Sequence, residues 1–127
     1  MTYTLLFFGL LFVHFLADFL VQTDWQAVNK SKDVEALSRH VATYTATFLI
    51  FLPFMCEVTI GRVPSSIIIL FCVATFATHW ITDYVTSRIA AYYYQKEDRH
   101  AFFAMVGLDQ FIHQATLLLT MNQLLVS

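Results

Sequence analysis

The stretch from residue 64 to residue 91, PSSIIILFCVATFATHWITDYVTSRIAA, decides the fold. About 20 consecutive apolar residues are enough to cross a bilayer as a helix, and this stretch is longer than that. Three further apolar segments accompany it, at about 3–22, 38–58 and 101–125, and 58% of the 127 residues are hydrophobic while 13% are charged. Such a composition excludes an ordinary soluble domain. The sequence therefore predicts a single all-α domain, 1–127, built as a polytopic transmembrane bundle of four helices.

Most of the basic residues gather in two of the links between these segments. Six of the seven lie within 23–39 or around the joint of the third and fourth segments, namely Lys30, Lys32, Arg39, Arg88, Lys96 and Arg99. The seventh, Arg62, lies in the link at the opposite end. By the positive-inside rule the two basic links face the cytoplasm, and both termini then lie on the non-cytoplasmic side. The link at 23–39 is too short for a domain and is predicted to be a turn with a helical piece at the membrane surface.

The lipid bilayer is the predicted partner of these segments, whereas nucleic acid is excluded as one. The formal net charge is −2, and acidic residues are interleaved with the basic ones in both links: Asp24, Asp33, Glu35, Glu97 and Asp98. A nucleic-acid interface needs a clustered basic surface, which this pattern does not offer. Association of several copies into a homo-oligomer stays open.

Three of the four apolar segments carry a histidine and an aspartate four residues apart. The pairs are His14 and Asp18, His79 and Asp83, and Asp109 and His113. On a helix this spacing places both side chains on one face, about one turn apart. An ionisable side chain at membrane depth costs roughly 2.5 to 3.5 kcal/mol on insertion scales, so six of them need a compensating purpose. A buried metal site is the simplest such purpose.

The depths of the paired residues overlap. A rise of about 1.5 Å per residue from the cytoplasmic boundary places all six between roughly 7 and 20 Å below it. His40 begins the second segment at the same face, with Tyr44 one turn further in. The predicted metal ligands are therefore His14, Asp18, His40, His79, Asp83, Asp109 and His113.

Imidazole and carboxylate together suit zinc, iron or manganese. A single tetrahedral zinc ion needs fewer ligands than this, whereas helical bundles build two-metal centres from inward-facing carboxylates and histidines. The sequence thus predicts one or two divalent ions as the cofactor. The alternatives are a metal-free proton or ion pathway and a purely structural network of His-Asp hydrogen bonds.

Further polar residues flank the predicted ligands. Five of them are predicted to orient the ligating side chains: Gln22, Tyr44, Thr75, Gln110 and Gln114. Supporting groups of this kind commonly fix ligating imidazoles and carboxylates in place. The alternative for these positions is a set of ordinary polar contacts between transmembrane helices.

The combination of these motifs resembles a known family. HFLADFLVQTDWQAVNK at 14–30, His40, HWITDYVTSRI at 79–89 and DQFIH at 109–113 are similar to the small bacterial and phage membrane proteins grouped as domain of unknown function 3307. The resemblance implies the bacterial inner membrane as the location, and it supplies topology and motif positions rather than an activity. A looser similarity to bacterial inner-membrane proteins described as metal-dependent hydrolases is an analogy only.

Three classes of function follow from the predicted cluster. The favoured one is a metal-dependent hydrolase acting on a membrane-associated or phosphoester substrate, with Asp18 or Asp109 as the general base. The second is a metal or proton transporter or channel. The outer halves of the segments are almost wholly apolar, which counts against this class. The third is a non-catalytic membrane interaction protein, of the phage effector kind, with a structural polar cluster.

Overall fold

The computed structural model describes residues 2–126 and contains five helices and one π-helical turn. In chain order these are α1 Thr2–Phe15, the π-helical turn η1 Leu16–Leu20, α2 Asp24–Asn29, α3 Val34–Thr59, α4 Ser65–Gln95 and α5 Arg99–Val126. Four stretches are helical, long and apolar enough to cross a membrane, Tyr3–Leu20, Val34–Thr59, Ser65–Gln95 and Arg99–Val126, which suggests an integral membrane protein. The predicted all-α class and the four long apolar helices are therefore confirmed.

The first span differs from the predicted continuous helix. α1 ends at Phe15, and η1 follows it directly. At the end of η1 the amide of Val21 donates to the carbonyl of Leu16, 2.9 Å away and five residues back. This hydrogen bond therefore encloses one residue more than the hydrogen bond of an α-helical turn does. π-Helical turns of this kind are frequent at functional sites. Asp18 lies within this turn.

The link between the first two spans forms the short helix α2. Its first turn is closed by a capping box, in which the Thr23 hydroxyl accepts from the Gln26 amide and the Gln26 side chain accepts from the Thr23 amide. The side-chain nitrogen of Gln26, Nε2, donates to the Thr43 hydroxyl on α3 at 3.4 Å. α2 is therefore held against α3, and it is the helical piece that the sequence predicts within 23–39.

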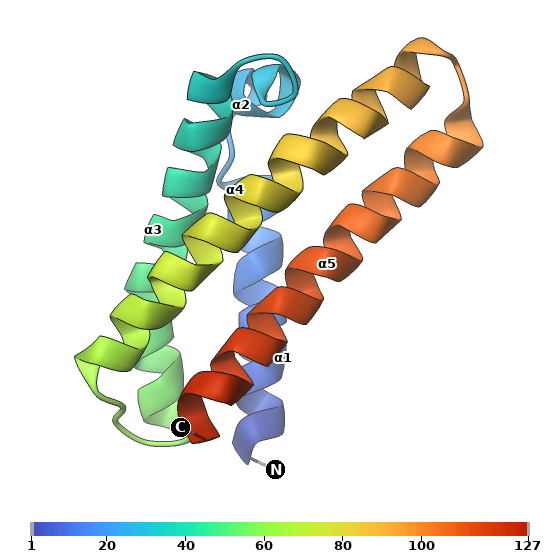
Figure 1. Ribbon diagram of the computed structural model, residues 1–127. Helices are drawn as coiled ribbons and strands as arrows, with labels where there is room; N and C mark the ends of the chain where they lie inside the picture. The colour runs from blue at the N-terminus through green and yellow to red at the C-terminus, as the bar shows by residue number, and fades with distance from the viewer. Residues whose placement is uncertain (1, 127) are drawn as a thin grey trace.

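The long helices are arranged so that the two ends of the chain lie together. Figure 1 shows the start of α1 and the end of α5 at one end of the bundle and α2 at the other. α4 packs along α5 and against α3, and α1 packs against α3 and α5. Gly61, at a φ of 90° that favours glycine, lies in the link between α3 and α4.

The buried side chains divide the bundle into an apolar half and a polar half. The apolar half, nearer the chain ends, is filled by Leu6, Leu10, Phe48, Leu52, Cys56, Ile68, Phe71, Cys72, Leu117 and Met121. The buried histidines and aspartates all lie on the α2 side of this core. Large apolar side chains such as Phe8, Phe54 and Phe111 are exposed, as lipid-facing positions would be.

Candidate metal centre

Helices α1, α3, α4 and α5 together with η1 bring the seven predicted ligands into one cluster. His14, His40, His79 and His113, with Asp18 and Asp83, are each at most 3% exposed. Asp109 is the outlier, because its side chain is 16% exposed. Buried ionisable groups at such density are expensive unless they bind one another or a cation. The depth argument made from the sequence therefore identifies the residues that meet.

Four ligand atoms form a compact first group: Asp18 Oδ1, His40 Nε2, His79 Nε2 and Asp83 Oδ2. His40 Nε2 lies 3.1 Å from Asp18 Oδ1, 3.2 Å from His79 Nε2 and 3.4 Å from Asp83 Oδ2. His79 Nε2 lies 3.6 Å from Asp18 Oδ1 and 3.5 Å from Asp83 Oδ2. Ligand atoms placed tetrahedrally about 2.0 to 2.1 Å from an ion are about 3.3 Å apart. The spacing of Asp18, His40 and His79 thus fits ligands of one divalent ion, with Asp83 Oδ2 beside the two histidines.

The hydrogen bonding of this first group also leaves room for a cation. Asp18 Oδ1 is buried, and although His40 Nε2 lies 3.1 Å from it, the oxygen accepts no hydrogen bond of good geometry within residues 2–126. A buried carboxylate oxygen without a donor is costly, and a bound cation would remove that cost. Three residues of the group, Asp18, His40 and His79, satisfy the geometry of a potential metal site by themselves.

A second group, His79, Asp83 and His113, lies beside the first, and it has His79 and Asp83 in common with it. Asp83 Oδ1 is 3.0 Å from His113 Nε2, which in turn lies 3.3 Å from Asp109 Oδ1. His79, Asp83 and His113 form the second set whose geometry could hold a metal, and the rings of His79 and His113 stack with centroids 4.0 Å apart. Thr86 donates to Asp109 Oδ1. The two oxygens of Asp83 therefore belong to different groups.

His14 lies at the edge of the cluster and has both ring nitrogens engaged. Nδ1 is 2.8 Å from the Tyr44 hydroxyl, and Nε2 is 2.9 Å from Gln110 Oε1. Because a carboxamide oxygen only accepts, His14 Nε2 carries the proton and Nδ1 accepts from Tyr44. Neither nitrogen is then free for a metal ion. The structure thus brings His14 to the predicted site in a position that suits a supporting residue better than a ligand.

Gln110 joins three members of the cluster. Its Nε2 donates to Asp18 Oδ2 at 2.8 Å and to Asp109 Oδ2 at 3.1 Å, while its Oε1 accepts from His14. Each of these carboxylates keeps its other oxygen for a different contact. Gln110 is therefore placed to hold the carboxylates of Asp18 and Asp109, and its role as a supporting residue stays a prediction.

Replacing Gln110 tests this role. We expect Gln110→Leu to lower the unfolding free energy of the metal-free protein in detergent by about 1 to 2 kcal/mol, because His14 and two carboxylates lose a partner. Gln114→Leu is the matched control, since Gln114 is exposed on the same helix. Unfolding monitored by circular dichroism measures both. Equal stability of the two variants would contradict the role assigned to Gln110.

The other predicted supporting residues differ in what they contact. Tyr44 is fully buried, with its ring centroid 4.0 Å from that of His79. Gln22 Oε1 and Thr75 Oγ1 are buried without a hydrogen-bond partner in the described part of the chain. Gln114 faces outward. Within residues 2–126, Tyr44 and Gln110 are thus the members of the predicted five that make hydrogen bonds to the cluster.

Lys30 is a functional candidate that the sequence pattern does not single out. It follows α2, and its Nζ lies 2.8 Å from Asp83 Oδ2 with the side chain 18% exposed. Burial disfavours the ammonium form, but the carboxylates of Asp83 and Asp18 together outweigh burial and raise the pKa of Lys30 above its ordinary value. Nothing in the local pattern separates Lys30 from Lys32, and only the fold shows which of them reaches the cluster.

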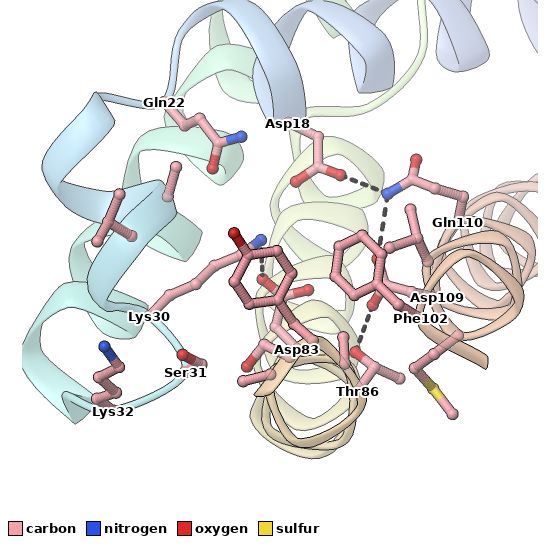
Figure 2. A pocket seen from close by; sticks show the side chains of 18 of the residues that line it. Asp18, Gln22, Lys30, Ser31, Lys32, Asp83, Thr86, Phe102, Asp109 and Gln110 are labelled. Atoms are coloured by element: carbon pink, nitrogen blue, oxygen red, sulfur yellow. Dashed lines mark hydrogen bonds and ion pairs between the residues drawn. The ribbon is translucent and has the colours of Figure 1, made fainter. Parts of the chain in front are cut away.

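A cavity of about 610 Å³ opens beside the cluster. Figure 2 shows Lys30 and Lys32 on one side of it and Asp109 and Gln110 on the other. The carboxylates of Asp18, Asp83 and Asp109 form its polar floor. Its apolar lining comes from Phe19, Ala27, Val28, Ala90, Ala91, Tyr94, Phe102, Met105 and Val106. The cavity is thus amphiphilic and gives access to the cluster from the α2 end.

Comparison with known proteins places the chain in a family without adding an activity. No curated protein and no solved structure matches it. One family model, described as a protein of unknown function (DUF3307), matches residues 6–127 and so spans the bundle and every member of the cluster. The resemblance seen in the sequence motifs is therefore confirmed, and the chain belongs to the DUF3307 family.

Proposed function

We propose that this protein is a metal-dependent hydrolase with a two-ion centre inside the membrane. The observation that carries the proposal is the position of Asp83, whose Oδ2 lies among the first group and whose Oδ1 contacts His113 of the second. A carboxylate shared in this way is typical of two-metal centres, in which the ions are about 3.5 to 4 Å apart. The nitrogen and oxygen ligands suit zinc, iron or manganese.

The two groups differ in how completely the protein fills them. Asp18, His40 and His79 are proposed to hold the first ion, with Asp83 Oδ2 close to both histidines as a fourth ligand that would close the site. The second has Asp83 and His113 besides the shared His79, and Asp83 lines the cavity, which would leave a position open to water as in a catalytic site. Divalent ions in such centres lower the pKa of a water molecule and polarise the bond to be cleaved.

Asp109 is the proposed general base. It is the partly exposed carboxylate of the cluster, it lines the cavity, and it lies next to His113. Thr86 and Gln110 donate to its two oxygens and hold its orientation. Asp18, the other carboxylate that the sequence offers for this role, is nearly fully buried and belongs to the closed group. We assign Asp18 to metal binding and Asp109 to proton transfer.

The cavity supports a membrane-associated or phosphoester substrate. Its polar floor would receive the reacting group, and its apolar lining would receive a hydrocarbon portion. The basic links lie at the α2 end, so we propose that this end faces the cytoplasm and that both termini lie on the other side. A bacterial inner membrane is the proposed location.

The alternative functions receive less support from the packing. A transporter or channel needs polar groups along the whole path, whereas the half of the bundle nearer the chain ends is filled by apolar side chains. A non-catalytic interaction protein with structural metal would need closed sites only. The cavity beside Asp109 favours a site that a substrate enters.

Metal content and hydrolysis test the proposal together. We expect purified protein in detergent to carry two divalent ions per chain by elemental analysis and to hydrolyse a member of a phosphoester and lipid panel. A strong chelator should abolish hydrolysis, and added zinc or manganese should restore it. His79→Ala, which removes a ligand, is the control expected to lose metal. Folded wild-type protein without stoichiometric metal would refute the proposal, and metal without turnover on any substrate would leave only a structural role.

A further inference from the structure

Lys30 and the first metal-binding group use the same oxygen atom. Lys30 Nζ is 2.8 Å from Asp83 Oδ2, and that oxygen is also 3.4 Å from His40 Nε2 and 3.5 Å from His79 Nε2. An ammonium group and a divalent cation repel each other, and both seek the same carboxylate lone pairs. Lys30 and a metal ion therefore compete for Asp83.

The backbone of Lys30 is held in place outside the spans, whereas its side chain has space to change position. Its backbone follows α2, which the Thr23 capping box and the bond from Gln26 to Thr43 hold in place. Its side chain lines the cavity, so the ammonium can leave Asp83 without leaving this space. A long flexible stem carrying a compact charge suits such a change of partner.

The charge of the cavity floor indicates what the released ammonium would meet. The side chains that line the cavity include three carboxylates and two ammonium groups, those of Lys30 and Lys32, which together carry a charge of −1. Two divalent ions would change this charge to +3, and the floor then favours an anion. The apolar lining above it favours a hydrocarbon chain attached to that anion. Inorganic phosphate would satisfy only the first of these features.

We propose that Lys30 is an exchangeable counter-ion, which neutralises Asp83 in the metal-free protein and binds the anionic head group of an amphiphilic substrate once metal is bound. This rests on the proposed metal centre and extends it to the head group of the substrate. Lys30 is here a specificity residue, and the bond-breaking chemistry does not pass through it. In the metal-free state it stabilises the buried carboxylates in place of the ions.

Binding measurements on the metal-stripped protein in dodecyl maltoside test the exchange. We expect Lys30→Met to bind Zn²⁺ about tenfold more tightly than wild type, since the competing ammonium is gone. For the zinc-loaded protein, we expect the same variant to bind dodecylphosphonate about tenfold more weakly. Lys30→Arg should keep most of the affinity for the phosphonate. Lys96→Met is the matched control, because Lys96 lies over the Tyr92 ring at the end of α4, away from the cavity lining.

Two further probes identify which part of the ligand matters. Methylphosphonate carries the anionic group alone and dodecanol the chain alone, and each should bind more weakly than dodecylphosphonate. Unchanged or weaker Zn²⁺ binding by Lys30→Met would overturn the exchange, as would unchanged phosphonate affinity. Wild type that binds no zinc would overturn the metal centre and the exchange together. Wild type that binds zinc and hydrolyses phosphoesters, with Lys30→Met behaving identically, would overturn the exchange alone.

Discussion

Asp83→Asn is expected to remove both metal ions at once. The amide keeps one carbonyl oxygen but loses the charge and the second ligand oxygen, and the two oxygens of Asp83 lie in different groups. Loss of a merely supporting group costs about 10- to 100-fold in metal affinity, so we expect more than about 100-fold here. Elemental analysis after dialysis against limiting zinc should show close to no bound ion, and hydrolysis should be abolished.

The result is interpreted by comparison with a variant that changes a ligand of one group alone. His40→Ala should lose one ion and keep the other, because His40 contacts only the first group. Asp83→Asn also leaves Lys30 without its partner, and the double variant with Lys30→Met removes that unpaired charge. Asp33→Asn is a neutral control, since asparagine caps a helix as well as aspartate does. Retention of one full ion by Asp83→Asn would show that the groups do not share this carboxylate.

Asp109→Asn is expected to separate turnover from metal binding. Proton transfer by a positioned side chain contributes roughly 10²- to 10⁴-fold, so kcat should fall by about that factor. The ion of the first group should remain, because Asp109 contributes no atom to it. At saturating zinc the second site should fill as well. Steady-state kinetics and elemental analysis on the same preparation measure the two effects.

A variant that removes a carboxylate outside the site supplies an independent check on this result. Glu57→Gln is a suitable control, because Glu57 lies on α3 outside the cluster and outside the cavity beside it. If Asp109→Asn keeps its kcat, another group must be the general base. If Asp109→Asn loses both ions, Asp109 is a metal ligand.

The spans and the composition of the cluster could be predicted from the sequence. The lengths of the apolar segments are enough to predict the four spans. In a bilayer, a single segment can hydrogen-bond all of its backbone polar groups only as a helix. Pairs at a spacing of four residues then give a shared face, and counting residues from the basic links gives a common depth. These arguments use distances along one helix and from one surface, which the sequence contains.

The contacts across helices could not be predicted in the same way. His14 has the same spacing from Asp18 as the other pairs, yet Tyr44 and Gln110 take both of its nitrogens. Lys30 lies outside the spans and reaches Asp83 only because α2 folds back over the end of the bundle. Rotation of each helix about its axis and the path of a link depend on packing between elements, and neither has a local signal.

The π-helical turn at Leu16–Leu20 has a consequence for how this chain tolerates insertions and deletions. A continuous α-helix advances by 100° per residue, so a turn that encloses one extra residue shifts everything after it by about that angle. Deleting one residue here would relieve the distortion and yet rotate the Asp18 side of the turn against the His14 side. The number of residues in this segment is thus fixed, and a change by even one residue would be harmful. The identity of an exposed side chain in it is less restricted.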